Sequence, residues 1–506
     1  MKKGLGNKIY IAVFMLILVL PTVCMNFKPH QKSEIDNKVL TEFPDFTKSP
    51  TETMQQLSDY AADRVGFRED AITLYTLACD KVFGVMIHPL FMYGKEGHVY
   101  YKDKDYIAAY QKLNTDEEFM DDFNEFLCQT SDYLKEKDIK FLYFLCPDKK
   151  TIYPEYFPDT VHVKDDNTSV IDYMKSKLIE DDFEYIIPDD VLREKKEEFR
   201  EQNLLIYNKK YDATHWNEFG SFISHSVLDE HIQKWFSDVS PLDIGDFSLE
   251  MVKMDHLDQS NFPIDDDVPV YTLLNDTSED ATSYLEGNLK CNTTTFYSHY
   301  MNNAVENNRI LLVFTDSYFA TYHKYYNNRF KEVYFVHRQN YDTVQYFVNL
   351  LFPDAVIFET AERCISSEMP LLADFKDYYY ESPYKETDIE SNEIIPYTIT
   401  SAEGVRVEGN KIYINPEEGE SIVSISGILN DYERTKDLNI YFEIQGNVLE
   451  TDNCALHRIA DENELKQFEI NVQRRYITPG EVRLFAVDEN TGTKCEIETF
   501  EVEYGK

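Results

Sequence analysis

The stretch that decides the fold is ILLVFTDSYF, residues 310–319. Five apolar residues lead into the polar turn Thr-Asp-Ser, and a stretch that we expect to be helical follows. An unbroken apolar run of this length is typical of a strand buried on both faces of a parallel sheet. A serine in the turn after such a strand lies at the carboxyl edge of the sheet, where α/β proteins place their functional groups. The stretch therefore predicts an α/β domain with Ser317 as candidate nucleophile, although a serine that caps the next helix fits the same pattern.

The neighbouring sequence repeats this pattern of buried strands and amphipathic helices. Further short apolar runs lie at 139–145, 183–187, 333–336 and 355–358. Helical spacing of apolar residues is found at 119–134, 217–235 and 341–351. Since a helix followed by a buried strand is the unit of a parallel sheet, we expect one α/β domain over residues 27–385.

A second group of polar residues, DATHWN at 212–217, opens one of these predicted helices. A carboxylate three residues before a histidine can accept the Nδ1 proton and leave Nε2 facing a cleft. A helix cap or a salt-bridged loop would use the same residues. Because functional groups gather at the carboxyl edge of a parallel sheet, we expect Asp212 and His215 to meet Ser317 there as a triad.

The region 390–506 has a different character. Seven short alternating segments, separated by turn residues such as those at 409–410 and 479–480, predict a β-sandwich. Its strands carry aromatic residues that can either stack on sugars or fill the core: Tyr413, Tyr441, Phe442, Phe485 and Tyr504.

The amino terminus predicts the compartment. Lys2, Lys3 and Lys8 precede an apolar run from Ile9 to Leu20. Residues 1–26 are therefore interpreted as a signal-anchor helix with the rest of the chain outside the membrane, and a cleaved signal peptide of a secreted protein is the alternative.

Composition excludes several classes of function. The 506 residues include 50 Lys and Arg against 92 Asp and Glu, a net charge of -42 that repels nucleic acid. A hydrophobic fraction of 43% with 14% aromatics nevertheless indicates a folded protein. The chain has no phosphate-binding glycine motif, no C-x-x-C and no H-E-x-x-H, so we expect neither a cofactor nor a metal. Seven of the eight cysteines lie beyond the anchor, an odd number, and Cys454 and Cys495 are the best disulfide candidates.

These motifs resemble those of a known family. Asp316-Ser317 after a strand resembles the nucleophile block of the SGNH (GDSL) hydrolases, and Asp212-x-x-His215 resembles their Asp/His block. Asp and His precede Ser, an order that resembles the alginate O-acetyltransferase (AlgJ/AlgX-like) family. Further stretches that fit this family are 33–40, 63–69, 146–149, 153–155, 352–357 and 362–363. Thr315, where Gly is usual, and Ala213, where the alginate enzymes more often have Asp, depart from the pattern.

The resemblance implies an SGNH-like fold and an extracytoplasmic polysaccharide O-acetyltransferase. In this reading Ser317 is acetylated, His215 is the base and Asp212 orients it. A multi-pass membrane-bound O-acyltransferase is the expected partner that supplies the acetyl group. A carbohydrate acetylesterase of the same fold, or a non-catalytic polysaccharide-binding surface protein, are the alternatives.

Less is implied about the other site residues. The second oxyanion donor of SGNH enzymes, an asparagine, has no clear counterpart. Candidates for an oxyanion or substrate role are the neighbours of the serine and two residues after the strand at 333–336: Asp316, Tyr318, Arg338 and Asn340. The charge of -42 favours a neutral or mildly charged glycan over a polyuronate, unless basic residues cluster at the serine, the candidates being Lys149, Lys150, Arg338 and Arg363.

Overall fold

The structure is a computed structural model. It describes residues 2–505 apart from 34–37, 48, 292–295, 366–379, 381, 416–420, 431, 436 and 452–465.

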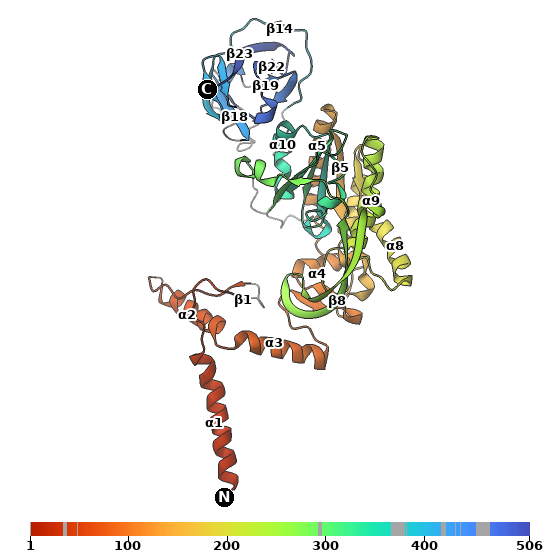
Figure 1. The fold of residues 1–506 in the computed structure, drawn as a ribbon, viewed down its shortest axis with the longest axis vertical. Coiled ribbons are helices and arrows are strands. Elements are labelled where there is room, and N and C mark those ends of the chain that lie inside the picture. The colour runs from red at the N-terminus through yellow and green to blue at the C-terminus, as the bar shows by residue number, and fades with distance from the viewer. Residues whose placement is uncertain are drawn as a thin grey trace.

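A seven-stranded sheet forms the centre of the molecule (Figure 1). Its order is β6-β5-β13-β11-β12-β10-β9. The strands are β5 (Lys140–Cys146), β6 (Glu184–Ile186), β9 (Glu279–Asp280), β10 (Tyr297–Met301), β11 (Ile310–Thr315), β12 (Glu332–His337) and β13 (Ala355–Ala361). The first five strands in this order pair in parallel, which confirms the predicted fold class, whereas β10 and β9 add an antiparallel edge that the sequence did not predict.

Both faces of this sheet are covered by helices, because its strands are apolar on both sides. Leu312 and Phe314 of β11 pack into one core together with α5 (Glu117–Glu136), α7 (Val170–Leu178) and α10 (Val344–Leu351). Leu311 and Val313 of the same strand pack into a second core with α8 (Asp189–Glu201) and α9 (Glu218–Trp235). The predicted helices at 119–134, 217–235 and 341–351 are confirmed.

The carboxyl-terminal region forms two further sheets, as predicted. One contains β14 (Glu390–Ser391), β16 (Arg406–Glu408), β17 (Lys411–Ile414), β19 (Leu438–Ile444), β20 (Asn447–Glu450), β22 (Gly480–Asp488) and β23 (Lys494–Tyr504). The other contains β15 (Tyr397–Glu403), β18 (Ile422–Leu429) and β21 (Lys466–Gln473). Apolar residues of both sheets share a core, which makes a β-sandwich.

The aromatic residues of the sandwich divide between core and surface. Phe442 lies in the core of the sandwich. Tyr441 and Phe485 are buried and stack on one another beside Tyr384, so none of these three rings is exposed to a sugar. Tyr413 is half-buried beneath the guanidinium of Arg406, and Tyr504 is exposed. An exposed sugar-binding face therefore has at most these last two among the five candidates.

The sandwich meets the central sheet at the edge where the parallel strands begin. Glu332, the first residue of β12, binds both Nη atoms of Arg475 at 2.8 and 2.9 Å. Lys137, just before β5, donates to the carboxylate of Glu450 at 2.6 and 2.8 Å. In Figure 1 the sandwich accordingly lies beyond α10 and α5, whereas α4 (Lys104–Tyr110) lies on the other side of the central sheet. The carboxyl edge of the sheet is left to the functional site.

The amino-terminal region contains α1 (Lys2–Val23), α2 (Pro50–Arg64) and α3 (Arg68–Ala78), followed by a hairpin of β3 (Phe91–Tyr93) and β4 (Val99–Tyr101). None of the helices in the described part of the chain has the length and apolar character needed to cross a bilayer. The predicted signal anchor thus finds no support, and it stays a prediction.

A long hairpin of β7 (Phe247–Leu257) and β8 (Ser260–Leu273) was not predicted. Its residues alternate between exposed and half-buried over most of its length, so it carries no continuous apolar run. The disulfide prediction is wrong for Cys495, which is buried and unbonded, and its proposed partner Cys454 lies outside the described residues.

Candidate active site

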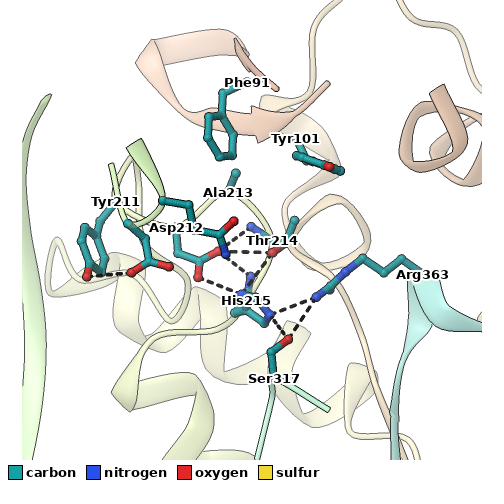
Figure 2. Close-up of a pocket in the computed structure, with 11 residues that line it drawn as sticks. Phe91, Tyr101, Tyr211, Asp212, Ala213, Thr214, His215, Ser317 and Arg363 are labelled. Carbon is teal, nitrogen blue, oxygen red and sulfur yellow. Dashed lines mark hydrogen bonds and ion pairs between the residues drawn. The ribbon is translucent and has the colours of Figure 1, made fainter. Parts of the chain in front are cut away.

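Three residues predicted from the sequence lie in one chain of hydrogen bonds at the carboxyl edge of the sheet (Figure 2). Ser317 Oγ lies 2.7 Å from His215 Nε2, and His215 Nδ1 lies 2.8 Å from Asp212 Oδ2. Ser317 is exposed to solvent, and His215 and Asp212 are half-buried. This geometry suits a serine activated by a histidine that a carboxylate orients.

The loop before α9 fixes the orientation of His215. Asp212 Oδ1 accepts the backbone N–H groups of Thr214 and His215 at 2.8 and 3.0 Å, so its other oxygen stays directed at the imidazole. Burial raises the pKa of Asp212, but the interaction with His215 and these backbone donors outweigh it and hold that pKa well below its usual range. The cap of α9 is Asn217, which accepts the N–H groups of Phe219 and Gly220, so Asp212 is not the helix cap.

The turn after β11 differs from the prediction, because no α-helix begins behind Ser317. Residues 318–321 form turns, and the next helical segment is the short 3₁₀ turn His323–Tyr325. Asp316 Oδ1 accepts the N–H of Tyr318 at 3.0 Å, and its Oδ2 accepts the N–H of Ala361 at 2.9 Å. Asp316 therefore holds the turn against β13, and it occupies a backbone donor that an oxyanion hole would have used.

The other two candidates also support this turn. The buried Arg338 places Nε 3.5 Å from Asp316 Oδ2, behind the turn. Asn340 Nδ2 donates to the carbonyl of His337 at 3.1 Å. These contacts assign Arg338 and Asn340 to the framework of the site.

Arg363 was predicted only as one of four basic residues that could gather near the serine, and the structure places it in direct contact with the triad. Its Nη2 lies 2.9 Å from His215 Nε2 and 3.5 Å from Ser317 Oγ, while Nη1 binds Asp148. The guanidinium thus reaches the position where charge develops when a serine attacks an acyl carbon. The sequence signals were its basic charge, the resemblance at 362–363, and the place of Glu362-Arg363 directly after the strand β13.

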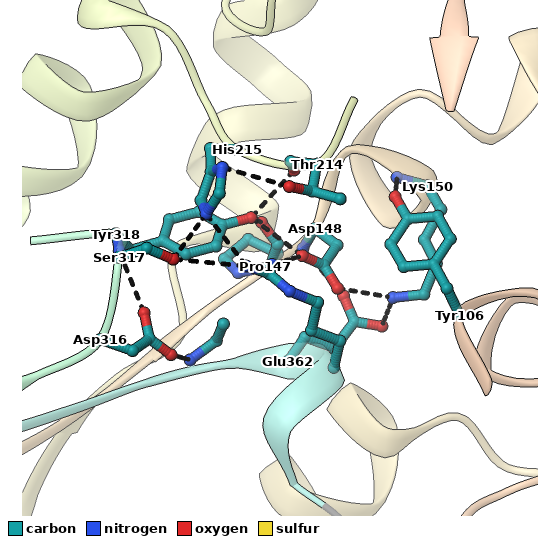
Figure 3. A network of polar contacts seen from close by, with 12 residues as sticks. Tyr106, Pro147, Asp148, Lys150, Thr214, His215, Asp316, Ser317, Tyr318 and Glu362 are labelled. Atoms are coloured by element: carbon teal, nitrogen blue, oxygen red, sulfur yellow. Dashed lines mark hydrogen bonds and ion pairs between the residues drawn. The ribbon is translucent and has the colours of Figure 1, made fainter. Parts of the chain in front are cut away.

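Asp148, Lys150 and Glu362 form a buried ionic cluster (Figure 3). The cluster holds Arg363 in place through Asp148. Lys150 Nζ lies 3.1 Å from Asp148 and 2.8 Å from Glu362, and these three side chains are at most 4% exposed. Glu362 also accepts the N–H of Asp148 at 3.0 Å and the hydroxyl of Thr151 at 2.6 Å. Because Asp148 follows β5 and Glu362 follows β13, the cluster joins the carboxyl ends of two neighbouring strands.

Tyr318 links the serine turn to the histidine loop. Its phenol oxygen lies 3.0 Å from three acceptors, the carbonyls of Pro147 and Thr214 and the carboxylate of Asp148 (Figure 3). Its ring packs edge-on against His215 with centroids 4.6 Å apart. The phenol is fully buried, so Tyr318 is a structural part of the site.

The structure defines an α/β protein with a mostly parallel sheet and with Ser, His and Asp at the carboxyl edge of that sheet. Solved structures similar to this chain include Bacillus cereus PatB1, with 17% identity and a TM-score of 0.41 over 55% of this chain and 98% of that chain. They also include the O-acetyltransferase domain of Pseudomonas putida AlgJ, with 14% identity and a TM-score of 0.37 over 56% and 94%. Pseudomonas aeruginosa AlgX follows with 13% identity and a TM-score of 0.36 over 76% and 90%.

AlgJ and AlgX belong to the family that the sequence resembles. No family model and no curated protein matches the chain. These TM-scores are below 0.5, so the likeness carries no information about function beyond what the residues of the site give.

Proposed function

We propose that this protein is an extracytoplasmic polysaccharide O-acetyltransferase that works through an acetyl-serine intermediate. The observation that carries the proposal is the continuous chain Ser317–His215–Asp212 with the guanidinium of Arg363 beside it.

In the first half-reaction Ser317 Oγ attacks the acetyl carbon of the donor while His215 Nε2 takes the hydroxyl proton. The bond between the acetyl carbon and the donor's leaving group then breaks, and the leaving group receives that proton. Asp212 stabilises the charged imidazole, and Arg363 Nη2 faces the negative charge on the acetyl oxygen. In the second half-reaction a sugar hydroxyl gives its proton to His215 Nε2 and attacks the acetyl carbon. The bond between that carbon and Ser317 Oγ then breaks, and His215 returns the proton to Oγ.

The donor is part of the proposal. We expect the acetyl group to come from a multi-pass membrane-bound O-acyltransferase, with residues 1–26 keeping this chain at the outer face of the same membrane.

One observation favours a second candidate, an acetylesterase. Ser317 is exposed, so water as well as a sugar can reach the acetyl-enzyme. The two functions share the first half-reaction and differ only in the acceptor.

The test is acetylation of the purified chain by 4-nitrophenyl acetate, followed by peptide mapping with mass spectrometry. We expect one acetyl group on the peptide that contains Ser317, none on that peptide in Ser317→Ala, and unchanged labelling in Ser298→Ala on β10. Acetylation of Ser317→Ala at the wild-type rate would contradict the proposed nucleophile. Transfer to a glycan, as opposed to water, then separates the transferase from the esterase.

A further inference from the structure

The pocket in front of Ser317 has an outer part that the triad does not use (Figure 2). Ser317, His215 and Arg363 line its inner end, and the whole cavity has a volume of about 220 Å³. The outer residues come from three separate segments: Phe91 and Tyr101, Tyr211, and Asp258 with Gln259. Since drug-sized ligands fill pockets of roughly 300–1,000 Å³, this cavity suits a single sugar ring.

The outer residues present aromatic surface and a carboxylate. Phe91 and Tyr101 lie on paired strands β3 and β4, directly opposite one another in the register. Tyr211 donates its phenol hydrogen to Asp258 Oδ1 at 3.0 Å, and the N–H of Asp258 donates to the carbonyl of Tyr211 at 3.0 Å. Asp258 and Gln259 form the exposed tip of the β7–β8 hairpin. A rim of this kind offers apolar ring faces and hydrogen-bond acceptors to a pyranose.

The sequence offers four basic residues that would make this pocket positive if their charges faced it. Lys149 and Lys150 are buried and do not line the cavity. Lys150 is held between Asp148 and Glu362, and Lys149 Nζ donates to the carbonyls of Val99 and Lys209 at 2.8 and 3.0 Å. Neither ammonium group therefore faces an incoming substrate.

The two arginines are also matched by carboxylates. Arg338 lies against Asp316, and Arg363 binds Asp148. Among the lysines and arginines that the structure describes, Arg363 lines the cavity, and Asp212 and Asp258 line it as well. Because Asp258 is the exposed charge at the rim, an anionic ring entering the pocket meets a like charge before it reaches the guanidinium.

On the basis of the function proposed above, we propose that the outer part of this pocket is the acceptor subsite, that it takes one uncharged sugar residue, and that Asp258 excludes uronates from it. The basic residues do not reverse the acidic character of the chain at its active site. Asp258 acts on the choice of acceptor, and it takes no part in acetylation of the serine.

The test measures how sugars accelerate loss of the acetyl group from acetyl-Ser317. The acceptors are matched methyl glycosides that differ only at carbon 6: glucoside against glucuronide, and galactoside against galacturonide. We expect the neutral member of at least one pair to be the better acceptor at about 0.15 M salt. In Asp258→Asn the ratio of acceleration by the neutral glycoside to acceleration by the uronate should fall about fivefold. Asp255→Asn, an exposed carboxylate three residues earlier on the same hairpin, is the matched control and should leave the preference unchanged.

Three results would overturn this subsite. They are a clear preference for the uronate, an unchanged preference in Asp258→Asn, and no acceleration by either neutral glycoside.

A second experiment measures binding of the same glycosides to Ser317→Ala by saturation-transfer NMR. This measurement does not depend on acetylation of the serine. If Ser317 is never acetylated but the neutral glycosides bind and Asp258→Asn shifts their advantage over the uronates, the proposed function fails and the subsite stands. If acetylation occurs and Ser317→Ala shows no such preference, the function stands and the subsite fails.

Discussion

The two edges of the central sheet each hold an arginine fixed by a buried carboxylate, and they use it differently. At the amino edge both Nη atoms of Arg475 bind Glu332, which fastens the sandwich. At the carboxyl edge only Nη1 of Arg363 binds Asp148, and Nη2 lies against His215 and Ser317. The position of the second nitrogen therefore decides whether such a pair holds the structure together or serves the reaction.

The strongest test of this difference is removal of the nucleophile at the carboxyl edge. Ser317→Ala should reduce acetyl transfer and ester hydrolysis at least about a thousandfold, because no other group replaces Oγ in front of His215. Its free energy of unfolding should change by less than about 1 kcal/mol, since the side chain is exposed. Activity is followed with 4-nitrophenyl acetate and stability by urea unfolding. An active Ser317→Ala variant would exclude the triad.

Removal of the Arg363 guanidinium, whose two Nη atoms have different partners, should have the next largest effect. Arg363→Ala should lower kcat about a hundredfold, the usual loss when one oxyanion donor is removed. Arg363→Lys keeps the charge but cannot reach Asp148 and Ser317 together, so its kcat should fall between those of wild type and Arg363→Ala. Steady-state kinetics on samples shown to be folded by circular dichroism measure this. A wild-type kcat in Arg363→Ala would mean that Arg363 is structural, like Arg475.

The corresponding change at the amino edge should affect stability and leave catalysis unchanged. Arg475→Met leaves Glu332 without its bidentate partner and should cost about 3 kcal/mol in the free energy of unfolding. Arg406→Met, which breaks an exposed pair with Glu408, is the matched control and should cost less than about 1 kcal/mol. Urea unfolding measures both, and kcat of the folded variants should equal that of wild type. A loss of kcat in Arg475→Met would show that the two edges are coupled.

Protonation of Glu332 in acid should weaken the attachment of the sandwich at the amino edge of the sheet. Burial raises the pKa of this carboxyl, but hydrogen bonds from His299, Arg475 and Tyr334 outweigh burial and lower its pKa to about 2. The folded-state pKa is thus below the unfolded value of 4.5, so the stabilisation is complete above pH 4.5 and is lost as the pH falls from 4.5 toward 2. It amounts to at most about 3 kcal/mol.

The measurement compares unfolding free energies of wild type and Glu332→Gln between pH 6 and pH 3, and the advantage of wild type should shrink on acidification. A constant difference across that range would contradict the role of Glu332.

The sequence predicted those parts of the site that neighbouring residues in the chain create. An apolar run before Thr-Asp-Ser placed Ser317 at a strand end, and the spacing of Asp212 and His215 placed both on one loop. The position of Arg363 could not be predicted in this way, because its carboxylate partner Asp148 is far away in sequence and only the parallel pairing of β5 with β13 brings them together. The prediction of a helix after Ser317 was wrong. The ring of Tyr318 is apolar because it packs into the core, and the backbone there turns around Asp316.

The β7–β8 hairpin escaped prediction for a different reason. It is exposed along much of its length, so it lacks the apolar pattern by which strands are recognised. It nevertheless supplies Asp258 to the pocket. Sequence patterns thus revealed the buried framework more readily than the exposed segment that is proposed to select the acceptor.

The phenol of Tyr318 has a consequence for motion within the site. Its single hydrogen can be donated to only one of its three acceptors at a time, and all three lie at 3.0 Å. A small displacement of one acceptor therefore transfers the bond to another instead of breaking the link. Tyr318 directly follows Ser317, and one acceptor is the carbonyl directly before His215. The phenol therefore ties the turn of the nucleophile to the loop of its base, and we expect this link to persist when any one of the three acceptors shifts.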